Sequence, residues 1–261
     1  MRSVVDGAAV RLDGIGKRMA RTGDDVLADV NVTVGPNESV AIVGPSGVGK
    51  STLLNVVAGL ISADRGEAYV DGRPVTGPDP RVGYLTQKDT LFPWRTALRN
   101  VELPLQVRGV DRRTRRERAE AALHLVGLRD AAHRYPAQLS GGMRRRVALA
   151  RLLVAEPRVL LLDEPFSALD AQLRVALQAD LVDLVERDRR PMLLVTHDLE
   201  EAITVADRVL VLRGRPAAIT ADITISYPRP RDVAAVRFDP QFPILLQRLW
   251  KEIGDGGAAR R

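Results

Sequence analysis

Three short apolar runs in the second half of the chain predict buried strands. They cover residues 159–162, 192–195 and 209–212 and consist of leucine, valine and methionine alone. Segments with apolar residues at helical spacing lie between them. Strands that alternate with helices are typical of a mainly parallel sheet covered on both faces, so the pattern predicts an α/β fold.

The first half of the chain predicts further strands and helices. Residues 26–34 alternate apolar and polar positions, as a half-buried strand does, and residues 39–43 form an apolar run that fits a buried strand. Apolar residues recur at helical spacing over residues 51–60. From 111 to 152 the pattern is again helical, with a loop at Tyr135-Pro136.

The C-terminal part begins with one more strand-like pattern. Residues 219–225 alternate, and Asp239-Pro240 is a typical helix start. An apolar stripe over residues 242–253 follows, and we expect this helix to pack back on the core. From the length that follows Leu212 we expect no separate ligand-sensing domain.

Composition narrows the classes of function. Of the 261 residues, 45% are hydrophobic and 28% are charged, which is an ordinary globular mixture. The absence of cysteine excludes disulfides, Cys-ligated metals and thiol nucleophiles, and the presence of only three histidines argues against a multi-histidine metal site. No apolar stretch reaches membrane-spanning length, and Asp6 lies where a signal peptide needs its apolar region. We therefore expect a cytoplasmic protein.

The net charge of +6 comes mostly from arginine, since only four of the 39 basic residues are lysines. The densest basic run, residues 112–118, opens a predicted helix and fits a solvated helix face better than a tract for a phosphate backbone. Aromatic residues make up 4% of the chain, which argues against base stacking. We expect no nucleic-acid partner.

A glycine-rich loop joins the strand at 39–43 to the helix that follows. Glycines allow successive N–H groups to point at phosphate oxygens, and the helix start adds its positive dipole end. Lys50 would neutralise the β- and γ-phosphates, and the Ser51 hydroxyl would bind Mg²⁺. The loop therefore predicts a nucleoside triphosphate site, with Thr52 directly after it. Its sequence fits the P-loop pattern and reads Gly44-Pro45-Ser46-Gly47-Val48-Gly49-Lys50-Ser51.

A second anion-binding helix start is predicted near residue 140. Ser140 is a natural N-cap, and Gly141 and Gly142 expose the first N–H groups of the next helix. Together with Leu139 and Met143, these residues resemble the signature sequence of ABC-transporter ATPases. The resemblance covers roughly residues 10–253.

The resemblance implies roles for five further residues. Asp163, directly after a buried strand, would hold Mg²⁺, and Glu164 would accept a proton from the attacking water or polarise it. Gln87 would touch the magnesium ion and the water, and His197 would reach the γ-phosphate. Asp170 would lie where two copies of the chain meet.

The same resemblance implies an architecture and partners. Residues 8–233 would form an ABC ATPase domain of the P-loop class, with a mainly parallel sheet, an antiparallel β edge and a helical subdomain inserted at about 88–156. Residues 234–253 would form a C-terminal helix packed on the core, and 254–261 a flexible tail. Two copies would sandwich ATP head to tail. They would dock on a transmembrane permease at the cytoplasmic face of the cell membrane, and an extracytoplasmic solute-binding protein would deliver the solute.

A narrower resemblance follows Gln87. Residues 91–96 with Asn100, and the segment 228–232, resemble the ATPases of nitrate, sulfonate and taurine importers. Phe92 and Trp94 would form a socket for a helix of the permease; alternatively, they pack beneath the helical subdomain. We expect an importer of a small organic or anionic solute. An exporter ATPase and a soluble ABC ATPase that acts on nucleic acid are the alternatives.

Three positions depart from the family pattern. Arg145 stands where relatives carry glutamine, and the sequence alone gives no physical reason for it. Asn37 replaces a usual glycine in a turn, where asparagine tolerates a positive φ. Met19 takes the place of the aromatic residue that stacks on adenine, and no aromatic residue precedes Tyr69. We therefore assign Met19 to the base site and expect weak nucleotide affinity.

Overall fold

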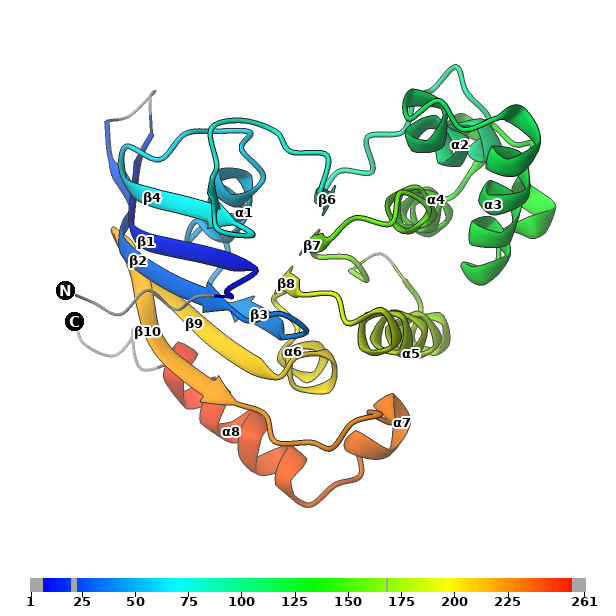
Figure 1. Ribbon diagram of the computed structural model, residues 1–261. Helices are drawn as coiled ribbons and strands as arrows, with labels where there is room; N and C mark the ends of the chain where they lie inside the picture. Colours follow the sequence, from blue (N-terminus) through cyan, green and yellow to red (C-terminus); the bar gives the residue numbers. More distant parts are fainter. Residues whose placement is uncertain (1–6, 20–22, 168, 255–261) are drawn as a thin grey trace.

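The computed structural model describes residues 7–19, 23–167 and 169–254. Within them, one curved sheet has the strand order β5-β4-β1-β2-β10-β9-β3-β8-β7-β6 (Figure 1). Its strands are β1 (Val10–Arg18), β2 (Asp25–Val34), β3 (Ser39–Val43), β4 (Arg65–Val70), β5 (Arg73–Pro74), β6 (Val82–Leu85), β7 (Val159–Asp163), β8 (Met192–Val195), β9 (Arg208–Gly214) and β10 (Ala217–Thr224).

One side of this sheet is parallel and the other is largely antiparallel. The neighbours β9, β3, β8, β7 and β6 all run in the same direction. β1 pairs antiparallel with β2 and with β4, and β9 pairs antiparallel with β10. The predicted α/β fold, with a mainly parallel sheet and an antiparallel β edge near the N-terminus, is confirmed.

Helices cover both faces of the sheet, and β3 shows why. Its residues alternate between two cores: Val40 and Ile42 pack on the side of the first helix, whereas Ala41 and Val43 face the larger helical layer. A strand buried on both faces is apolar throughout, as this run is. The helices are α1 (Lys50–Val57), α2 (Ala97–Val107), α3 (Arg112–Leu125), α4 (Gly141–Val154), α5 (Ala171–Asp188), α6 (Leu199–Val205), α7 (Val233–Val236) and α8 (Gln241–Gly254), with 3-10 turns at Arg129–Ala131 and Pro136–Gln138.

The helices after β6 form a group of their own. α2, α3 and α4 contact one another and lie together at one side of the sheet (Figure 1). All three fall inside the segment 88–156 that we expect to be an inserted subdomain. Within the described residues, no helix has both the length and the apolar character that a membrane span requires.

The C-terminal helix packs on the core. α8 contacts α6 and β9, and its side chains Phe242 and Leu249 are buried. It continues to Gly254, where the expected flexible tail begins. The remaining residues of that tail, 255–261, lie outside the described residues.

The parallel strands bring separate motifs to one edge of the sheet. Because β3, β8, β7 and β6 are neighbours with the same direction, their carboxyl ends meet at that edge. The P-loop follows β3, Gln87 follows β6, Asp163 ends β7, and His197 follows β8. This carboxyl edge is the candidate site.

Candidate functional site

The P-loop requires glycine where other strands lie against it. A Cβ atom on Gly44 would lie 2.2 Å from the backbone oxygen of Leu212 in β9. A Cβ atom on Gly49 would lie 2.9 Å from the side chains of Val26 and Leu27 in β2, and Gly49 has a φ of 115°. These close approaches fix the path of the loop from β3 into α1.

Lys50 begins α1, and its ammonium group lies inside the loop. The residue is 7% exposed, and its Nζ donates hydrogen bonds to the backbone oxygens of Gly44 (2.7 Å) and Pro45 (2.9 Å). Burial lowers the pKa of Lys50, whereas the nearby carboxylates of Glu164 and Asp163 raise it. The amine is thus held between the loop and two acids, where it can pair with a phosphate group.

Asp163 presents a buried carboxylate beside the P-loop. Burial raises the pKa of Asp163, and a hydrogen bond with Ser51 opposes that shift. Its Oδ1 has no hydrogen-bond partner among the described residues. A buried carboxylate oxygen without a partner is costly unless a proton or a cation neutralises it. Together with the Ser51 hydroxyl, Asp163 offers the oxygen ligands that hard divalent cations prefer.

Three residues predicted from separate motifs meet at the carboxylate of Glu164. Gln87 Nε2 lies 3.4 Å from Glu164 Oε2, and His197 Nδ1 lies 3.1 Å from Glu164 Oε1. The side chain of Glu164 is 20% exposed and that of His197 is 59% exposed. The cluster is therefore anchored at the sheet edge and open to solvent, as a site that takes up a water molecule must be.

The backbone of Glu164 is itself unusual. Its φ is 50°, in a region that residues other than glycine seldom adopt, and its N–H donates to the oxygen of Val195 at 2.8 Å. Strained residues of this kind persist where the surroundings fix them, and they cluster at functional sites. The bond to β8 fixes the turn that carries the Glu164 side chain out of β7.

The turn that carries His197 is held by a buried pair. Thr196 Oγ1 donates to Glu201 Oε2 at 2.8 Å and accepts from the N–H of Asp198 at 3.0 Å. Burial raises the pKa of Glu201 to about 8, so this side chain is mainly protonated at neutral pH. The sequence reasoning missed Glu201. The sequence did contain an indication that Glu201 is buried, because it lies four residues before Val205 and so on the apolar side of α6.

The signature segment forms the helix start that the sequence predicts. Ser140 is the N-cap of α4, and its Oγ accepts from the N–H of Met143 at 3.2 Å. Asp170 caps α5 by accepting from the N–H of Leu173 at 3.0 Å. Within the described residues, no hydrogen bond joins Ser140 or Asp170 to the Glu164 cluster. α4 packs on α2, α3 and β6, whereas α1 packs on β4, β7 and β8, so the two helix starts that we predict to bind anions belong to different parts of the fold.

Met19 follows β1, and its side chain is exposed. Its N–H donates to the oxygen of Asp24, its own oxygen accepts from Gly23, and the residue is 54% exposed. The side chain therefore has an apolar surface that a ligand can cover.

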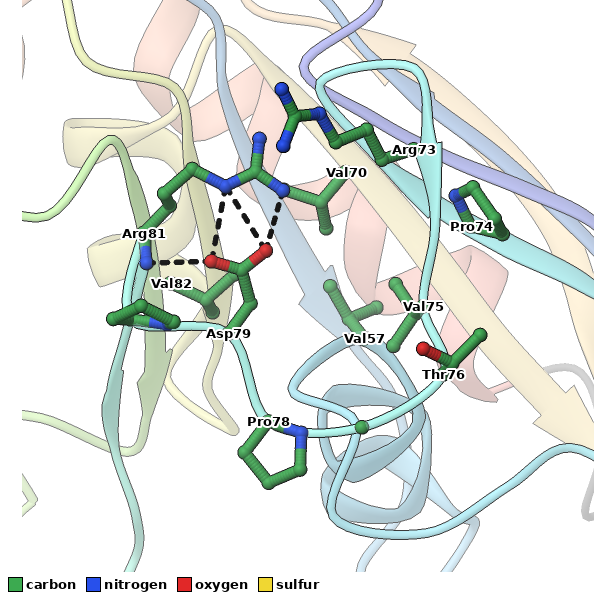
Figure 2. Close-up of a pocket in the computed structure, with 12 residues that line it drawn as sticks. Val57, Val70, Arg73, Pro74, Val75, Thr76, Pro78, Asp79, Arg81 and Val82 are labelled. Atoms are coloured by element: carbon green, nitrogen blue, oxygen red, sulfur yellow. Dashed lines mark hydrogen bonds and ion pairs between the residues drawn. The ribbon is translucent and has the colours of Figure 1, made fainter.

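A pocket of about 410 Å³ lies elsewhere, between β5, α1 and the start of β6 (Figure 2). Arg81 binds Asp79 there through its backbone N–H (2.8 Å) and its Nε (3.0 Å). The pocket reaches Val82, the first residue of β6, whereas Gln87 follows the last. It is thus remote from the carboxyl edge and from the predicted site residues.

Comparison with known proteins identifies the family. The sequence profile of the ABC transporter family matches residues 27–167. The chain is 45% identical to an ATP-binding protein of Brucella abortus over 87% of each chain. It is 42% identical to the taurine import ATP-binding protein TauB of Pseudomonas aeruginosa, over 88% of this chain and 89% of TauB.

A solved structure shares the fold. The dimeric ATP-binding cassette MJ0796, in a post-hydrolysis state bound to ADP and Pi, superposes with a TM-score of 0.76 and 33% identity. The match covers 84% of this chain and all of that one. Sequence and fold comparisons agree, and the chain belongs to the ABC transporter family of ATPases.

Proposed function

We propose that the chain is the ATP-hydrolysing subunit of an importer for a small organic or anionic solute. The observation that carries the hydrolytic part of the proposal is the contact of Gln87 and His197 with the Glu164 carboxylate, next to the P-loop. Release of phosphate from Mg-ATP by the purified chain tests hydrolysis. A rate no higher than that of a Glu164→Gln variant would contradict the proposal.

The triphosphate binds along the P-loop in this proposal. Residues 44–52 enclose the phosphates through backbone N–H groups, and Lys50 exchanges its two carbonyl partners for phosphate oxygens. Met19 lies against the base. The buried amine gains a charged partner in place of two neutral ones, which favours the anion.

The residues beside the P-loop fit a magnesium ion. Ser51 and Asp163 would hold it, with Gln87 at its edge, and the unpartnered Oδ1 of Asp163 would gain a ligand role. Among the described residues, no group of three or more histidine, aspartate or glutamate side chains could hold a metal. Mg²⁺ suits such a site because it binds through one or two carboxylates plus phosphate oxygens and waters. When bound, the ion neutralises charge on the phosphates.

Glu164 is the residue that acts on the attacking water. Its carboxylate accepts a proton from the water, or polarises it, while Gln87 and His197 hold the carboxylate in place. When Nδ1 of His197 faces Glu164, the second ring nitrogen, Nε2, can face the γ-phosphate, and it donates there when the ring carries a proton on both nitrogens. The three side chains thus connect the water to the phosphate that it attacks.

A second copy of the chain completes each site. The Ser140 helix start and the P-loop helix start pack on different elements, which favours their acting on different phosphates within one copy. In a head-to-tail dimer, Ser140, Gly141 and Gly142 of one copy would bind the γ-phosphate held by the other, and Asp170 would lie at their interface. The similar cassette MJ0796 is dimeric, which supports this arrangement.

The permease would dock beside the helical group. A pocket of about 590 Å³ lies between β6, α2 and α4, and Phe92 lines it. Trp94 is 70% exposed and its ring centroid lies 5.4 Å from that of Phe92. Buried Asn100 holds this loop by accepting from the N–H of Phe92 (2.8 Å) and donating to its oxygen (3.2 Å). An exposed aromatic on a braced loop fits a docking socket better than packing beneath the subdomain.

The import direction rests on the relatives. TauB is named as a taurine import protein, and the chain matches it over most of its length. We infer a transmembrane permease and an extracytoplasmic solute-binding protein as partners, which place the chain at the cytoplasmic face of the membrane.

Replacing Trp94 by alanine is expected to weaken docking and spare catalysis. An aromatic anchor often dominates an interface, so we expect the fraction bound to permease-containing membranes to fall about tenfold. Basal ATPase activity should stay unchanged, because among the described residues no hydrogen bond or ring contact joins Trp94 to the Glu164 cluster. Sedimentation with membranes and phosphate release measure the two effects. Trp250→Ala, at an exposed tryptophan of α8, is the matched control. Equal loss of ATPase activity in Trp94→Ala would favour a packing role.

Replacing Met19 by tyrosine is expected to tighten ATP binding several-fold. Stacking of a base on an aromatic ring contributes about 1–3 kcal/mol, against about 0.3–1.5 kcal/mol for a sulfur–aromatic contact. The wild-type chain should therefore bind ATP weakly and prefer it only slightly over GTP. Titration of both nucleotides measures this, with Met19→Leu as the control that adds no ring. Unchanged affinity in Met19→Tyr would show that residue 19 does not face the base.

A further inference from the structure

Arg145 lies in α4, two residues after the signature segment, and its side chain is buried. It is 4% exposed, and burial lowers its pKa while the charges of Asp163 and Asp89 raise it. A buried guanidinium is costly unless each of its N–H groups has an acceptor. The hydrogen-bond acceptors of the guanidinium therefore show which parts of the chain Arg145 holds together.

All five N–H groups of this guanidinium have backbone oxygens as acceptors. On one side, Nη1 donates to Thr86 and to Gln87 (3.2 Å). On the other side, Nη2 donates to Asp163 and to Glu164 (2.9 Å), and Nε donates to Pro165 (3.2 Å). One planar side chain thus joins the backbone that carries Gln87 to the backbone that carries Glu164.

These two segments come from different strands, β6 and β7, and both leave the sheet at the carboxyl edge. Their side chains meet at the 3.4 Å contact between Gln87 Nε2 and Glu164 Oε2. Neighbouring arginines of α4 bind the next residues of the first segment: Arg144 pairs with Asp89 at 2.9 Å, and Arg151 donates to the oxygen of Thr90 at 3.1 Å. Arg145 alone among these three spans both segments.

We infer that Arg145 is a positioning residue for hydrolysis: it holds Gln87 and Glu164 in register so that both act on the same water. The inference rests on the proposed function of Glu164. Glutamine has two N–H donors and lysine has three on a flexible stem, so neither side chain can reproduce five bonds in one plane. Among the described residues Arg145 donates no hydrogen bond to the P-loop, so its replacement should change nucleotide affinity less than the chemical step.

Arg145→Gln is the primary test, measured as steady-state hydrolysis of Mg-ATP by the full chain. We expect kcat to fall about 10- to 100-fold, since small displacements of reacting groups have effects of that size, while KM changes less than about threefold. Arg146→Gln is the matched control. Arg146 is the next residue in α4 and donates to the oxygens of Val126 (3.0 Å) and Gly127 (3.3 Å) instead of to the segments that carry Gln87 and Glu164. Its kcat should stay close to wild type.

A double-mutant cycle separates positioning from a general loss of stability. If Arg145 acts through Gln87, the losses of kcat in Arg145→Gln and Gln87→Ala should overlap strongly in the double variant, because the second change removes what the first has displaced. The Arg146→Gln change should combine additively with Gln87→Ala. Additive losses for Arg145, or a fall in Tm with unchanged kcat, would overturn the inference.

Arg145→Lys keeps the test decisive if Arg145→Gln does not fold. Lysine keeps the positive charge, so we expect a smaller loss of kcat than in Arg145→Gln. This loss should again be less than additive with the loss caused by Gln87→Ala. Wild-type kcat in Arg145→Lys would overturn the inference. The proposed function is tested separately: if Glu164→Gln hydrolyses ATP normally, the role of Glu164 fails whatever Arg145 does.

Discussion

Glu164→Gln is expected to bind Mg-ATP normally and to lose ATP turnover by about a hundredfold or more, the usual range for removing a general base. The amide keeps the size of the side chain and a hydrogen-bonding oxygen, so the contacts with Gln87 and His197 need not collapse. It also removes a negative charge that faces the γ-phosphate. The ATP-bound dimer should therefore persist, because product formation no longer separates the two copies.

Phosphate release and size-exclusion chromatography with ATP measure these two effects. Glu117→Gln, on the exposed surface of α3, makes the same chemical change away from the site and should behave as wild type. A Glu164→Gln protein that hydrolyses ATP rapidly, or that stays monomeric with ATP, would refute the role of Glu164.

Glu201→Gln is expected to remove a large part of the pH dependence of stability. The unfolded chain releases this proton near pH 4.5 and the folded chain near pH 8, so the folded state binds more protons between these values. Each pH unit in that window lowers the free energy of unfolding by about 1.4 kcal/mol. The contribution of Glu201 to the free energy of unfolding is thus fully present below pH 4.5 and is lost as the pH rises towards 8. Glutamine does not ionise, so its contribution to the free energy of unfolding does not change with pH.

Chemical unfolding at about pH 5.5 and about pH 7.5 tests this expectation, and the wild-type loss between them should exceed that of Glu201→Gln by about 2.5 kcal/mol. Glutamine keeps an oxygen acceptor for Thr196, so the turn before His197 should survive. Glu200→Gln, at the exposed neighbouring residue, is the control. Equal pH dependence in wild type and Glu201→Gln would mean that Glu201 is already ionised in the folded chain.

Much of the site could be predicted because its residues follow strand ends. Asp163 and His197 each come directly after an apolar run, and parallel neighbours bring such ends to one edge. The strand at Ser39–Val43 has the bounds that its apolar run predicts. Strand β1 was not predicted. Register shifts after Leu12 and Ile15 interrupt its alternation of apolar and polar positions, so the pattern that indicates a strand is lost there.

The buried charges could not be assigned from the sequence in the same way. Arg145 lies in a run of three arginines, and composition does not tell which one turns inward. Its position four residues before buried Leu149 was the available signal. What satisfies the guanidinium is a set of carbonyls from residues 86–87 and 163–165, which only the folded chain brings together.

The most direct test of the account is whether a second copy completes each ATP site. Lys50→Met disables the P-loop, and Ser140→Arg disables the signature helix start, so neither variant should hydrolyse ATP alone. Mixed dimers contain one site with an intact P-loop from one copy and an intact signature from the other. An equal mixture should therefore regain hydrolysis, up to about a quarter of the wild-type rate, because about half of random pairs are mixed and each has one complete site. A mixture as inactive as its two components would contradict the account, since it would place the P-loop and the signature that serve one ATP on the same copy.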